Sequence, residues 1–409
     1  MDSRDPRVIA FVMAGGAGNR LRPLTVARGK PAVPFGSKYR IIDFVLSNLV
    51  NSGYQSIYVL VQYLAQSLIE HLRRSWNISG TLGKNFVTAV PPQQRAGEFW
   101  FKGTADSIHQ NRNLVTDNAP DIVLVFGADH IYRMDVSQMV RFHLERGADA
   151  TISALPAPVE DAREFGVLAV DEEGRVERFD EKPLDPRPMP GDPLRALCSM
   201  GNYVFSSQVL MDALISDAAR EGEHDFGRTI IPALLGERKK LYAYDFMKNE
   251  IPGVRPTEEK GYWRDVGTIK SYWETQMDLL GETPRLDLSN PDWPIHTSAY
   301  PGPGSRIVSA QVENALIGEG CQIAGARIDR SVIGRGVIIE KGAEVVDSIV
   351  MDHTRIGAGA KLEKAIVDRF NQIGAGASVV DENADSFPGA VADPSGIIVL
   401  PRGFTRPVI

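Results

Sequence analysis

Residues 8–21 read Val-Ile-Ala-Phe-Val-Met-Ala-Gly-Gly-Ala-Gly-Asn-Arg-Leu. The apolar run Val8–Ala14 is short and rich in β-branched residues, which predicts a buried strand. In α/β folds, ligands bind beyond the carboxyl ends of such strands, where the glycine-rich turn lies. Gly15 and Gly16 let backbone N–H groups approach phosphate oxygens, and Arg20 adds a fixed positive charge. The stretch predicts an α/β domain with a phosphate-binding loop, although a tight structural turn is the alternative.

Two familiar phosphate-binding motifs are absent around this loop. A dinucleotide fingerprint requires glycine where Leu21 stands, and a Walker loop requires Ser or Thr where Pro31 follows Gly-Lys. Three cations nevertheless lie in or after the loop: Arg20, Arg28 and Lys30. They favour a polyphosphate ligand that is bound in another way.

The first two-thirds of the chain alternates short apolar runs with amphipathic stretches. Further strands are predicted at Ile57–Val61 and Ile122–Phe126. Helices are predicted at four amphipathic stretches: Asp43–Asn51, Ala65–Arg74, Thr104–Val115 and Val136–Arg146. This alternation is typical of a mostly parallel sheet covered by helices on both faces. Residues 166–170 and 175–179 predict a hairpin added to that sheet.

The last quarter of the chain carries an internal repeat. Ile-Gly pairs recur at residues 317–318, 333–334, 356–357 and 373–374, and other aliphatic residues mark steps of five or six residues. This period is typical of a hexapeptide β-helix, in which aliphatic side chains stack inside and glycine permits the tight corners. A proline-rich segment before it predicts a linker. We therefore expect an α/β domain at residues 1–285, a linker at 286–305 and a β-helix at 306–409.

The composition of the 409 residues excludes several classes of protein. The net charge of -7 argues against general nucleic-acid binding, which needs clustered Lys and Arg. With only Cys198 and Cys321, far apart in the sequence, no disulfide framework is possible, which favours a reducing compartment. The N-terminus lacks the features of a secretory signal, and the first apolar run is far too short to span a membrane. We expect a cytoplasmic protein.

Several motifs of the chain resemble those of a known protein family. Met13–Thr25 and Arg28–Val33 resemble the nucleotidyltransferase signature of sugar-nucleotide pyrophosphorylases. Further motifs resemble the bacterial glucose-1-phosphate adenylyltransferases, also called ADP-glucose pyrophosphorylases. These motifs occur in the family's order and spacing, at residues 39–44, 46–48, 51–53, 103–106, 129–132, 165–167, 181–183, 199–205, 224–227 and 262–268. With the repeat, the resemblance covers nearly the whole chain.

The resemblance implies a Rossmann-like nucleotidyltransferase domain, a left-handed parallel β-helix and a homotetramer. It implies that ATP and glucose 1-phosphate give ADP-glucose and pyrophosphate with Mg²⁺, for the synthesis of glycogen or related glucans. Enzymes of this family are usually controlled by glycolytic metabolites. The expected reaction is an in-line attack of the sugar phosphate on the α-phosphate, so the protein has to position the reactants and neutralise charge.

Two carboxylates are candidate metal ligands. Asp129 follows the predicted strand Ile122–Phe126, and Asp265 lies at another strand-to-helix junction. Carboxylates brought together in this way suit Mg²⁺, although Asp265 has the alternative of capping a helix. The resemblance assigns the metal ligands to these two positions and implies Arg20 and Lys182 as further catalytic residues, with Lys182 holding the phosphate of glucose 1-phosphate.

The resemblance also assigns contacts to both substrates. The predicted nucleotide side comprises Gly15, Gly16, Lys30, Gln62, Trp100, Phe101, Gly103 and Thr104. For Trp100, a place in the core is the alternative. The predicted sugar side comprises Gly166, Glu181, Lys182, Ser199, Asp225 and Phe226.

Several positions depart from the family's pattern, and none of them removes a charged catalytic group. Phe101 stands where the family often has Tyr, which removes a hydroxyl contact; Ala128 replaces a glycine, and Gly29 replaces an alanine. Ala27 stands where members that respond to activators often carry Lys. Two arginines remain as candidate ligands for an anionic effector, Arg28 and Arg40.

Other functions are alternatives to this one. One is the same reaction with UTP or dTTP, and another is that of a non-catalytic regulatory subunit, although such subunits tend to lose the residues matching Asp129 or Lys182. Hexapeptide β-helices often carry acyltransferases, but His353 is the only histidine in the repeat and is expected in a turn. The seven histidines show no spacing typical of a zinc site.

Overall fold

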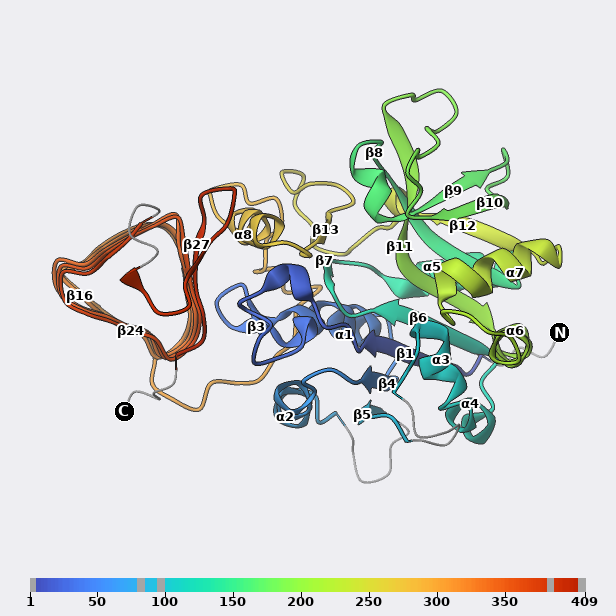
Figure 1. Cartoon of the computed structure of the whole chain (residues 1–409), viewed down its shortest axis with the longest axis horizontal. Helices are drawn as coiled ribbons and strands as arrows, with labels where there is room; N and C mark the ends of the chain where they lie inside the picture. Colours follow the sequence, from blue (N-terminus) through green and yellow to red (C-terminus); the bar gives the residue numbers. More distant parts are fainter. Residues whose placement is uncertain (1–4, 79–84, 94–99, 381–385, 404–409) are drawn as a thin grey trace.

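The computed structural model describes residues 5–78, 85–93, 100–380 and 386–403. An N-terminal α/β domain lies beside a C-terminal β-helix, which Figure 1 shows end-on as a triangle. The predicted fold class is confirmed for both domains. The end of the predicted β-helix domain, residues 404–409, lies outside the described residues.

The α/β domain is built on one nine-stranded sheet, whose main path has the order β10-β9-β11-β6-β1-β4-β5. In its interior, β1 (Val8–Ala14) runs parallel to β4 (Ser56–Val61) and β6 (Ile122–Gly127). The remaining strands are β5 (Phe86–Val90), β8 (Ala150–Pro158), β9 (Gly166–Val170), β10 (Val176–Glu181), β11 (Arg195–Ser206) and β12 (Leu241–Asp245). The three strands predicted first and the hairpin β9–β10 are confirmed.

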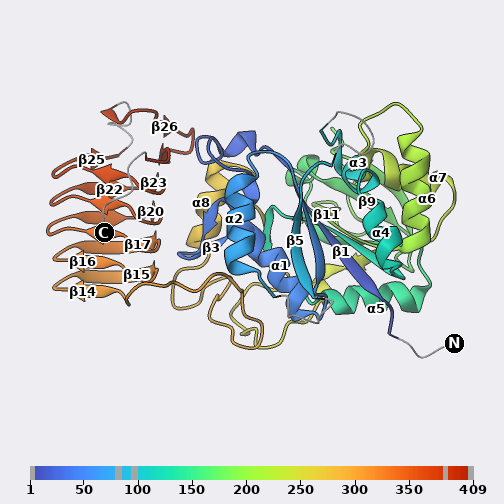
Figure 2. The ribbon, with the colours of Figure 1, turned by 90° about the horizontal axis from the view of Figure 1, so that it is seen from below.

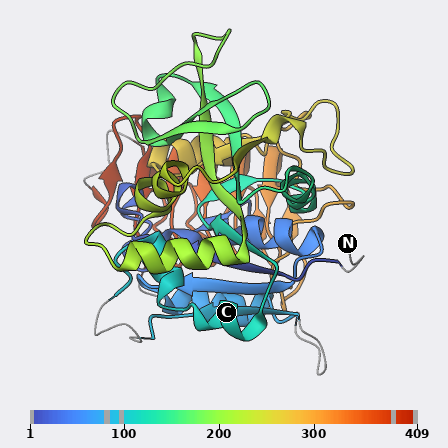
Figure 3. The same cartoon turned by 90° about the vertical axis from the view of Figure 1, so that its right-hand side faces the viewer.

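Apolar cores lie on both faces of this sheet, because alternate residues of a strand point to opposite sides. Ala10 and Val12 belong to one core, and Ile9 and Phe11 to the other. The first core is covered by α1 (Ile41–Asn51), α2 (Gln66–Ser75) and α5 (Val136–Arg146). The second is covered by α3 (Thr104–His109), α4 (Asn113–Asn118), α6 (Ser207–Ala218) and α7 (Ile231–Gly236). Figure 3 shows this domain from the side away from the β-helix.

The helix predicted at Thr104–Val115 is wrong as a single element, because α3 ends at His109 and α4 begins at Asn113. The Asn111 side chain donates to the carbonyl of Ser107, 2.9 Å away, and the Asn111 N–H donates to Ile108, three residues back. Asn favours such local hydrogen bonds over a continuous helix. The apolar periodicity of the stretch carries no sign of this break.

A short ribbon stands apart from the main sheet. In it, β7 (His130–Tyr132) pairs antiparallel with β13 (Trp263–Asp265), so that Asp265 lies opposite His130. The ribbon is followed by α8 (Ile269–Met277). A second small hairpin pairs β2 (Pro34–Phe35) with β3 (Tyr39–Arg40).

The β-helix consists of coils of 16 or 17 residues, as the register Gln322↔Ile338 and Ile338↔Arg355 shows. Figure 2 shows the coils stacked in layers. One sheet contains β14 (Arg306–Val308), β16 (Gln322–Ala324), β18 (Ile338–Ile339), β21 (Arg355–Ile356) and β24 (Gln372–Ile373). The other contains β15 (Gln311–Ile317), β17 (Arg327–Ile333), β19 (Glu344–Val346), β20 (Ile349–Val350), β22 (Lys361–Glu363), β23 (Ala365–Val367), β25 (Ser378–Val379), β26 (Val391–Ala392) and β27 (Ile398–Leu400).

The aliphatic positions of the repeat line the interior, as predicted; Ile328, Val345 and Val367 are fully buried. The reason given for the glycines of the Ile-Gly pairs is wrong, because none of these four glycines has the positive φ of a tight left-handed corner. A Cβ on Gly318 would instead lie 2.8 Å from the carbonyl carbon of Gly334. Gly334 and Gly357 are equally close to the next coil, so glycine is needed at these three positions because successive coils approach one another there; a Cβ on Gly374 would meet no described atom within 4 Å.

The two domains share an apolar core. Phe44 and Tyr272 from the α/β domain are buried with Ile349 and Ile366 from the β-helix. Between α8 and β14 the chain runs without a helix or strand from residue 278 to 305, which includes the predicted linker. This segment is packed rather than loose, since Leu286, Trp293 and Ile295 are buried.

In the described parts of the chain, no helix has the length and apolar character of a membrane span. The longest, α6, has 12 residues.

Candidate active site

A cavity of about 510 Å³ opens at the carboxyl ends of β1 and β6. Most of the residues predicted to bind substrate or metal line it. They are Gly15, Gly16, Arg20, Lys30, Gln62, Phe101, Gly103, Thr104, Asp129, Gly166, Glu181, Lys182, Ser199, Asp225, Phe226 and Asp265. The fold thus brings together side chains separated by up to 250 positions in the sequence. Trp100, Arg28 and Arg40 are predicted site residues that do not line this cavity.

A buried lysine joins the two predicted metal ligands. The Lys30 ammonium lies 3.0 Å from Oδ2 of Asp129 and 2.9 Å from Oδ1 of Asp265, and contacts one oxygen of each carboxylate. Burial lowers the pKa of Lys30, but the two carboxylates outweigh it and hold that pKa above its usual value. Burial raises the pKa of Asp129, yet the charges of His130 and Lys30 hold it well below its usual range. The Asp129 carboxylate is therefore ionised, and Lys30 holds it beside the carboxylate of Asp265.

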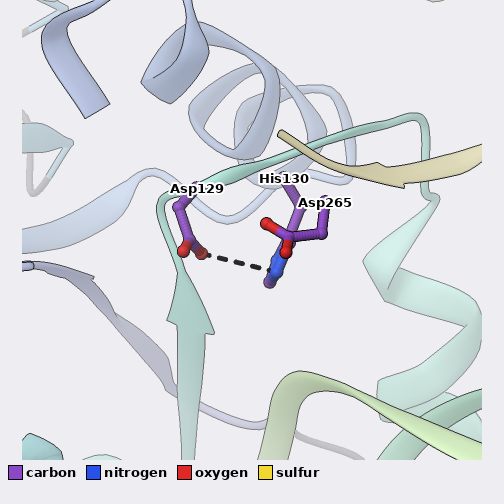
Figure 4. Close-up of side chains that lie close together, drawn as sticks. All are labelled: Asp129, His130 and Asp265. Carbon is purple, nitrogen blue, oxygen red and sulfur yellow. Dashed lines mark ion pairs between the residues drawn. The ribbon is translucent and has the colours of Figure 1, made fainter. Parts of the chain in front are cut away.

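A third potential ligand, His130, lies beside these carboxylates. Figure 4 shows Asp129, His130 and Asp265 turned toward one another. One ligand atom from each lies within 4.8 Å of the others, and Nε2 of His130 is 3.5 Å from Oδ1 of Asp129. His130 had no predicted role, because its place opposite Asp265 depends on the β7–β13 pairing.

These residues fit a divalent cation. Mg²⁺ prefers carboxylate oxygens and keeps several waters and phosphate oxygens, so that two carboxylates in an accessible cavity suffice. The alternative for Asp265 is wrong: Thr268 caps α8, accepting a hydrogen bond from the Ser271 N–H. The Asp265 carboxylate is therefore free of any capping role.

The glycine loop has two kinds of glycine. Gly18 has a φ of 64°, and a Cβ there would lie 2.8 Å from Cβ of Lys30, so the turn itself requires glycine. A Cβ on Gly16 would meet no protein atom within 4 Å. Packing within the described protein does not require a glycine there, so the open space beside the Gly16 backbone fits close approach by a ligand.

Arg20 follows the loop and is half exposed. Its Nη1 donates to Oε2 of Glu164 at 2.8 Å, and both side chains are more than half exposed. Glu164 also lines the cavity and was not predicted from the sequence. An exposed ion pair of this kind is worth little, about 0–1 kcal/mol, so the contact with Glu164 would not prevent Arg20 from binding an anion.

On the opposite wall, the Glu181 carboxylate is held between two glycine backbones. A Cβ on Gly227 would lie 2.4 Å from Oε2 of Glu181, and a Cβ on Gly166 would lie 3.0 Å from it. Burial and the charge of Asp225 raise the pKa of the Glu181 carboxyl. Gly227 was not predicted, and only the position of Glu181 in the folded chain reveals why it is glycine.

Lys182 has an unusual backbone conformation. Its φ is 48°, in the left-handed region that residues with a Cβ avoid. Its N–H donates to the carbonyl of Phe165 at 3.0 Å, which holds this conformation. Such strain tends to occur at functional sites. It directs Lys182 into the cavity beside Glu181.

Thr104 and Asp225 form a hydrogen-bonded unit. Oδ2 of Asp225 accepts from the Thr104 hydroxyl at 2.7 Å, and Oδ1 accepts from the backbone of Gly227 and Arg228. Gly103 allows this approach, since a Cβ there would lie 2.0 Å from the carbonyl oxygen of Glu223. Asp225 is therefore a structural cap as well as part of the wall.

The remaining aromatic and hydroxyl side chains differ in exposure. Phe226 is buried and stacks on Tyr203, so it supports the wall rather than projecting from it. Ser199, also buried, accepts a hydrogen bond from the Gly201 N–H. Trp100 is 66% exposed, which rules out the core position considered for it.

The side-chain amide of Gln62 is paired with a peptide group. Its oxygen accepts from the Phe101 N–H at 2.7 Å, and its nitrogen donates to the Phe101 carbonyl at 3.4 Å. Gln62 therefore holds the segment that begins at Phe101 against the end of β4.

The predicted effector residues lie at the boundary between the domains. Arg28 is buried, and its Nη2 donates to both carboxylate oxygens of Asp368 in the β-helix, at 2.8 and 2.7 Å. Arg40 donates to the carbonyl of Ala32 and the hydroxyl of Ser67. Arg28 is thus part of a structural ion pair, and its role in binding an effector stays a prediction.

Known proteins resemble this chain over nearly its whole length. A glucose-1-phosphate adenylyltransferase of Frankia casuarinae is 48% identical over 409 residues, covering 98% of each chain. The corresponding protein of Thermodesulfovibrio yellowstonii is 51% identical over 85% of this chain and 84% of its own. The chain belongs to the glucose-1-phosphate adenylyltransferase family. A protein of this family from Photobacterium profundum is 43% identical over 97% of this chain.

Two domain families divide the chain in the same way as the structure. The nucleotidyl transferase family matches residues 9–282, and the GlmU-like C-terminal hexapeptide family matches residues 304–400. Membership of the glucose-1-phosphate adenylyltransferase family makes this chain a nucleotidyltransferase, with its cavity in the first of these domains. The roles of individual residues remain predictions that the geometry supports.

Proposed function

We propose that the chain catalyses the reaction of ATP with α-D-glucose 1-phosphate to give ADP-glucose and pyrophosphate. One observation carries the proposal: a single cavity joins the glycine loop and Arg20 to the paired carboxylates and to Lys182 and Glu181. Both substrates are anionic, and the cavity has cations at both ends. Membership of the adenylyltransferase family supports ATP and glucose 1-phosphate as the pair.

In the proposed reaction, an oxygen of the sugar phosphate forms a bond to the α-phosphorus of ATP. The bond from that phosphorus to the bridging oxygen breaks, and its electron pair leaves with pyrophosphate. No covalent enzyme intermediate is needed. Arg20 and the loop backbone neutralise the triphosphate, Lys182 holds the sugar phosphate, and Glu181 accepts hydrogen bonds from sugar hydroxyls. Positioning the two reactants in this way supplies much of the acceleration.

Asp129 and Asp265 are the proposed ligands of a Mg²⁺ ion. When bound, this ion neutralises charge on the phosphate oxygens of the reactants. When no other cation is bound, Lys30 neutralises the same two carboxylates and so reduces the repulsion between them. Its ammonium lies at the boundary between the loop and the carboxylates, where it also suits a phosphate oxygen.

A pyrophosphate-release assay tests the proposal. We expect release with ATP, glucose 1-phosphate and Mg²⁺, and much less with UTP, dTTP or GTP. The variant Asp129→Asn supplies the negative control, and Glu172→Gln, on an exposed turn away from the cavity, supplies the matched active control. Equal or faster pyrophosphate release with another nucleotide would overturn the choice of ATP. No release with any nucleotide would overturn the proposed catalysis and favour a non-catalytic regulatory subunit.

Three further properties belong to the same proposal. The product serves the synthesis of glycogen or a related glucan, an anionic glycolytic metabolite controls the rate, and four copies of the chain assemble. A cytoplasmic location also stays a prediction. The assay above, repeated with a panel of phosphorylated metabolites, tests the control, and the mass of the protein in solution tests the tetramer.

A further inference from the structure

A second cavity, of about 490 Å³, lies at the far end of the β7–β13 ribbon. Arg133 follows β7 directly, Tyr262 precedes β13 directly, and both line this cavity. Asp129 and Asp265 lie at the opposite end of the same ribbon. No described residue lines both cavities. The second cavity is therefore separate from the proposed active site but built on the same two strands.

The wall of the second cavity contains a buried guanidinium with free donors. Arg133 is 5% exposed, and its Nη1 donates to Oε2 of Glu258 at 2.9 Å. Its Nε and Nη2 are buried and have no hydrogen-bond partner among the described residues. A buried donor left without an acceptor destabilises the folded protein, because its lost hydration is not replaced. The described residues around Arg133 therefore supply no acceptor for Nε and Nη2.

The two free nitrogens form one edge of the guanidinium. The N–H groups on Nε and Nη2 point in the same direction, and their spacing matches two oxygens of a carboxylate or phosphate. The contact with Glu258 fixes the plane of Arg133 and leaves this edge available. Glu258 itself is occupied, since it also accepts from the backbone of Arg255 and Asp287.

Most other charged side chains around the second cavity have partners of opposite charge, including two cations: Arg255 pairs with Asp287, and Arg285 pairs with Asp278 and Glu259. The lining of this cavity contains the cations Arg133, Arg255, Lys260 and Arg285 and the acids Glu250, Glu258 and Glu259. Glu259 is paired with Arg264 through both oxygens. The acids Glu258 and Glu259 are thus satisfied by specific partners. The exposed side chain of Lys260 lies on the same wall.

We propose that this second cavity binds a small oxyanion, a carboxylate or a phosphate, on the Nε–Nη2 edge of Arg133. Apolar side chains from the loop before β13, including Phe246 and Val254, line the rest of the space. The ligand class is therefore a small molecule with one anionic group and a compact apolar part. Because both nitrogens are buried, the side chains that cover them have to move aside when the anion binds.

Crystals of the full chain soaked with sodium selenate provide the first test. Selenate presents tetrahedral oxygens like those of phosphate, and selenium gives an anomalous signal. We expect an anomalous peak within hydrogen-bond reach of Nε and Nη2 of Arg133. A water or no peak at this edge, while selenate occupies the active-site cavity, would overturn the proposal. A parallel soak with 4-bromobenzoate, whose aryl bromide does not alkylate the protein, shows whether a carboxylate binds in place of a tetrahedral anion.

Calorimetric titration with inorganic phosphate provides the second test, in solution and without turnover. The variant Arg133→Lys keeps the charge and can keep the contact to Glu258, but it loses the two-nitrogen edge. We expect one binding event of the wild-type protein to weaken at least tenfold in this variant, and to persist in the matched variant Arg178→Lys, whose side chain pairs with Asp180 far from this cavity. Unchanged titrations of Arg133→Lys would refute the site. Neither test needs the proposed reaction, so its failure and that of the proposed function are distinguishable.

Discussion

Replacing Arg28 by glutamine should destabilise the protein strongly, although Arg28 lies outside the active-site cavity. The side chains of Arg28 and Asp368 are 3% and 1% exposed and form an ion pair between the domains, in which Nη2 of Arg28 contacts both carboxylate oxygens of Asp368. The substitution leaves the Asp368 carboxylate buried without its counter-charge. Removing one partner of a buried pair costs about 3–5 kcal/mol, because the remaining charge stays out of water.

This loss converts into a measurable melting shift. An unfolding entropy of about 2.1 cal/mol/K per residue gives about 0.9 kcal/mol/K for a chain of this length. The expected loss therefore lowers Tm by about 3–6 °C in a calorimetric scan. The control is Arg178→Gln, which removes an exposed partner of Asp180 and should cost about 0–1 kcal/mol.

A double variant tests the reasoning further. With Arg28→Met and Asp368→Leu together, neither charge of this pair remains buried, so most of the lost stability should return. The reasoning is refuted if Arg28→Gln costs no more than Arg178→Gln, or if the double variant is as unstable as the sum of its parts. The first outcome would mean that Arg28 is solvated and available to an effector, as the sequence suggested.

Four other changes have expected outcomes. Asp129→Asn should lower kcat at least a hundredfold while thermal melting shows a folded protein; near-normal turnover would remove Asp129 from the metal site. Lys182→Ala should raise KM for glucose 1-phosphate more than tenfold with KM for ATP within a few-fold, and equal changes in both would contradict its assignment. Gly227→Ala places a Cβ 2.4 Å from the Glu181 carboxylate, so it too should raise KM for the sugar phosphate, whereas unchanged kinetics would show that Glu181 does not contact the sugar. Burial lowers the pKa of His143 from 6.5 to about 4. As the pH falls between these two values, the unfolded chain binds a proton that the folded chain does not, so the free energy of unfolding from urea titrations should drop by about 3 kcal/mol. The variant His143→Gln should lack this pH dependence.

The spacing of apolar residues and the positions of glycine and proline between them predicted most of the fold. The strand at Val8–Ala14 matched at both ends because an apolar run followed directly by glycines has one reading. The repeat likewise specified the β-helix, since nearly all of its aliphatic positions are buried inside and only Ile317 is partly exposed. The break at Asn111 was missed because it arises from a side-chain hydrogen bond, which leaves the apolar pattern intact.

The candidate site was less predictable than the fold. Charged residues at strand ends, such as Asp129, follow from topology alone. The pairing of Lys30 with two carboxylates does not, because Lys30, Asp129 and Asp265 are distant in sequence and no periodicity relates them. For the same reason Glu164 was missed. Its contact with Arg20 joins two exposed side chains whose motifs carry no mutual signal.

The apolar core shared by the two domains means that neither is a detachable module. Phe44 and Tyr272 would be exposed to water in a chain truncated before the repeat, so the truncated protein should aggregate rather than fold as an active single-domain enzyme. Grafting this catalytic half onto another scaffold would therefore demand a substitute surface of matching shape. The repeat covers this core, which also contains Ile131 and Val266, the sequence neighbours of His130 and Asp265, so the packing behind the proposed metal site depends on both domains.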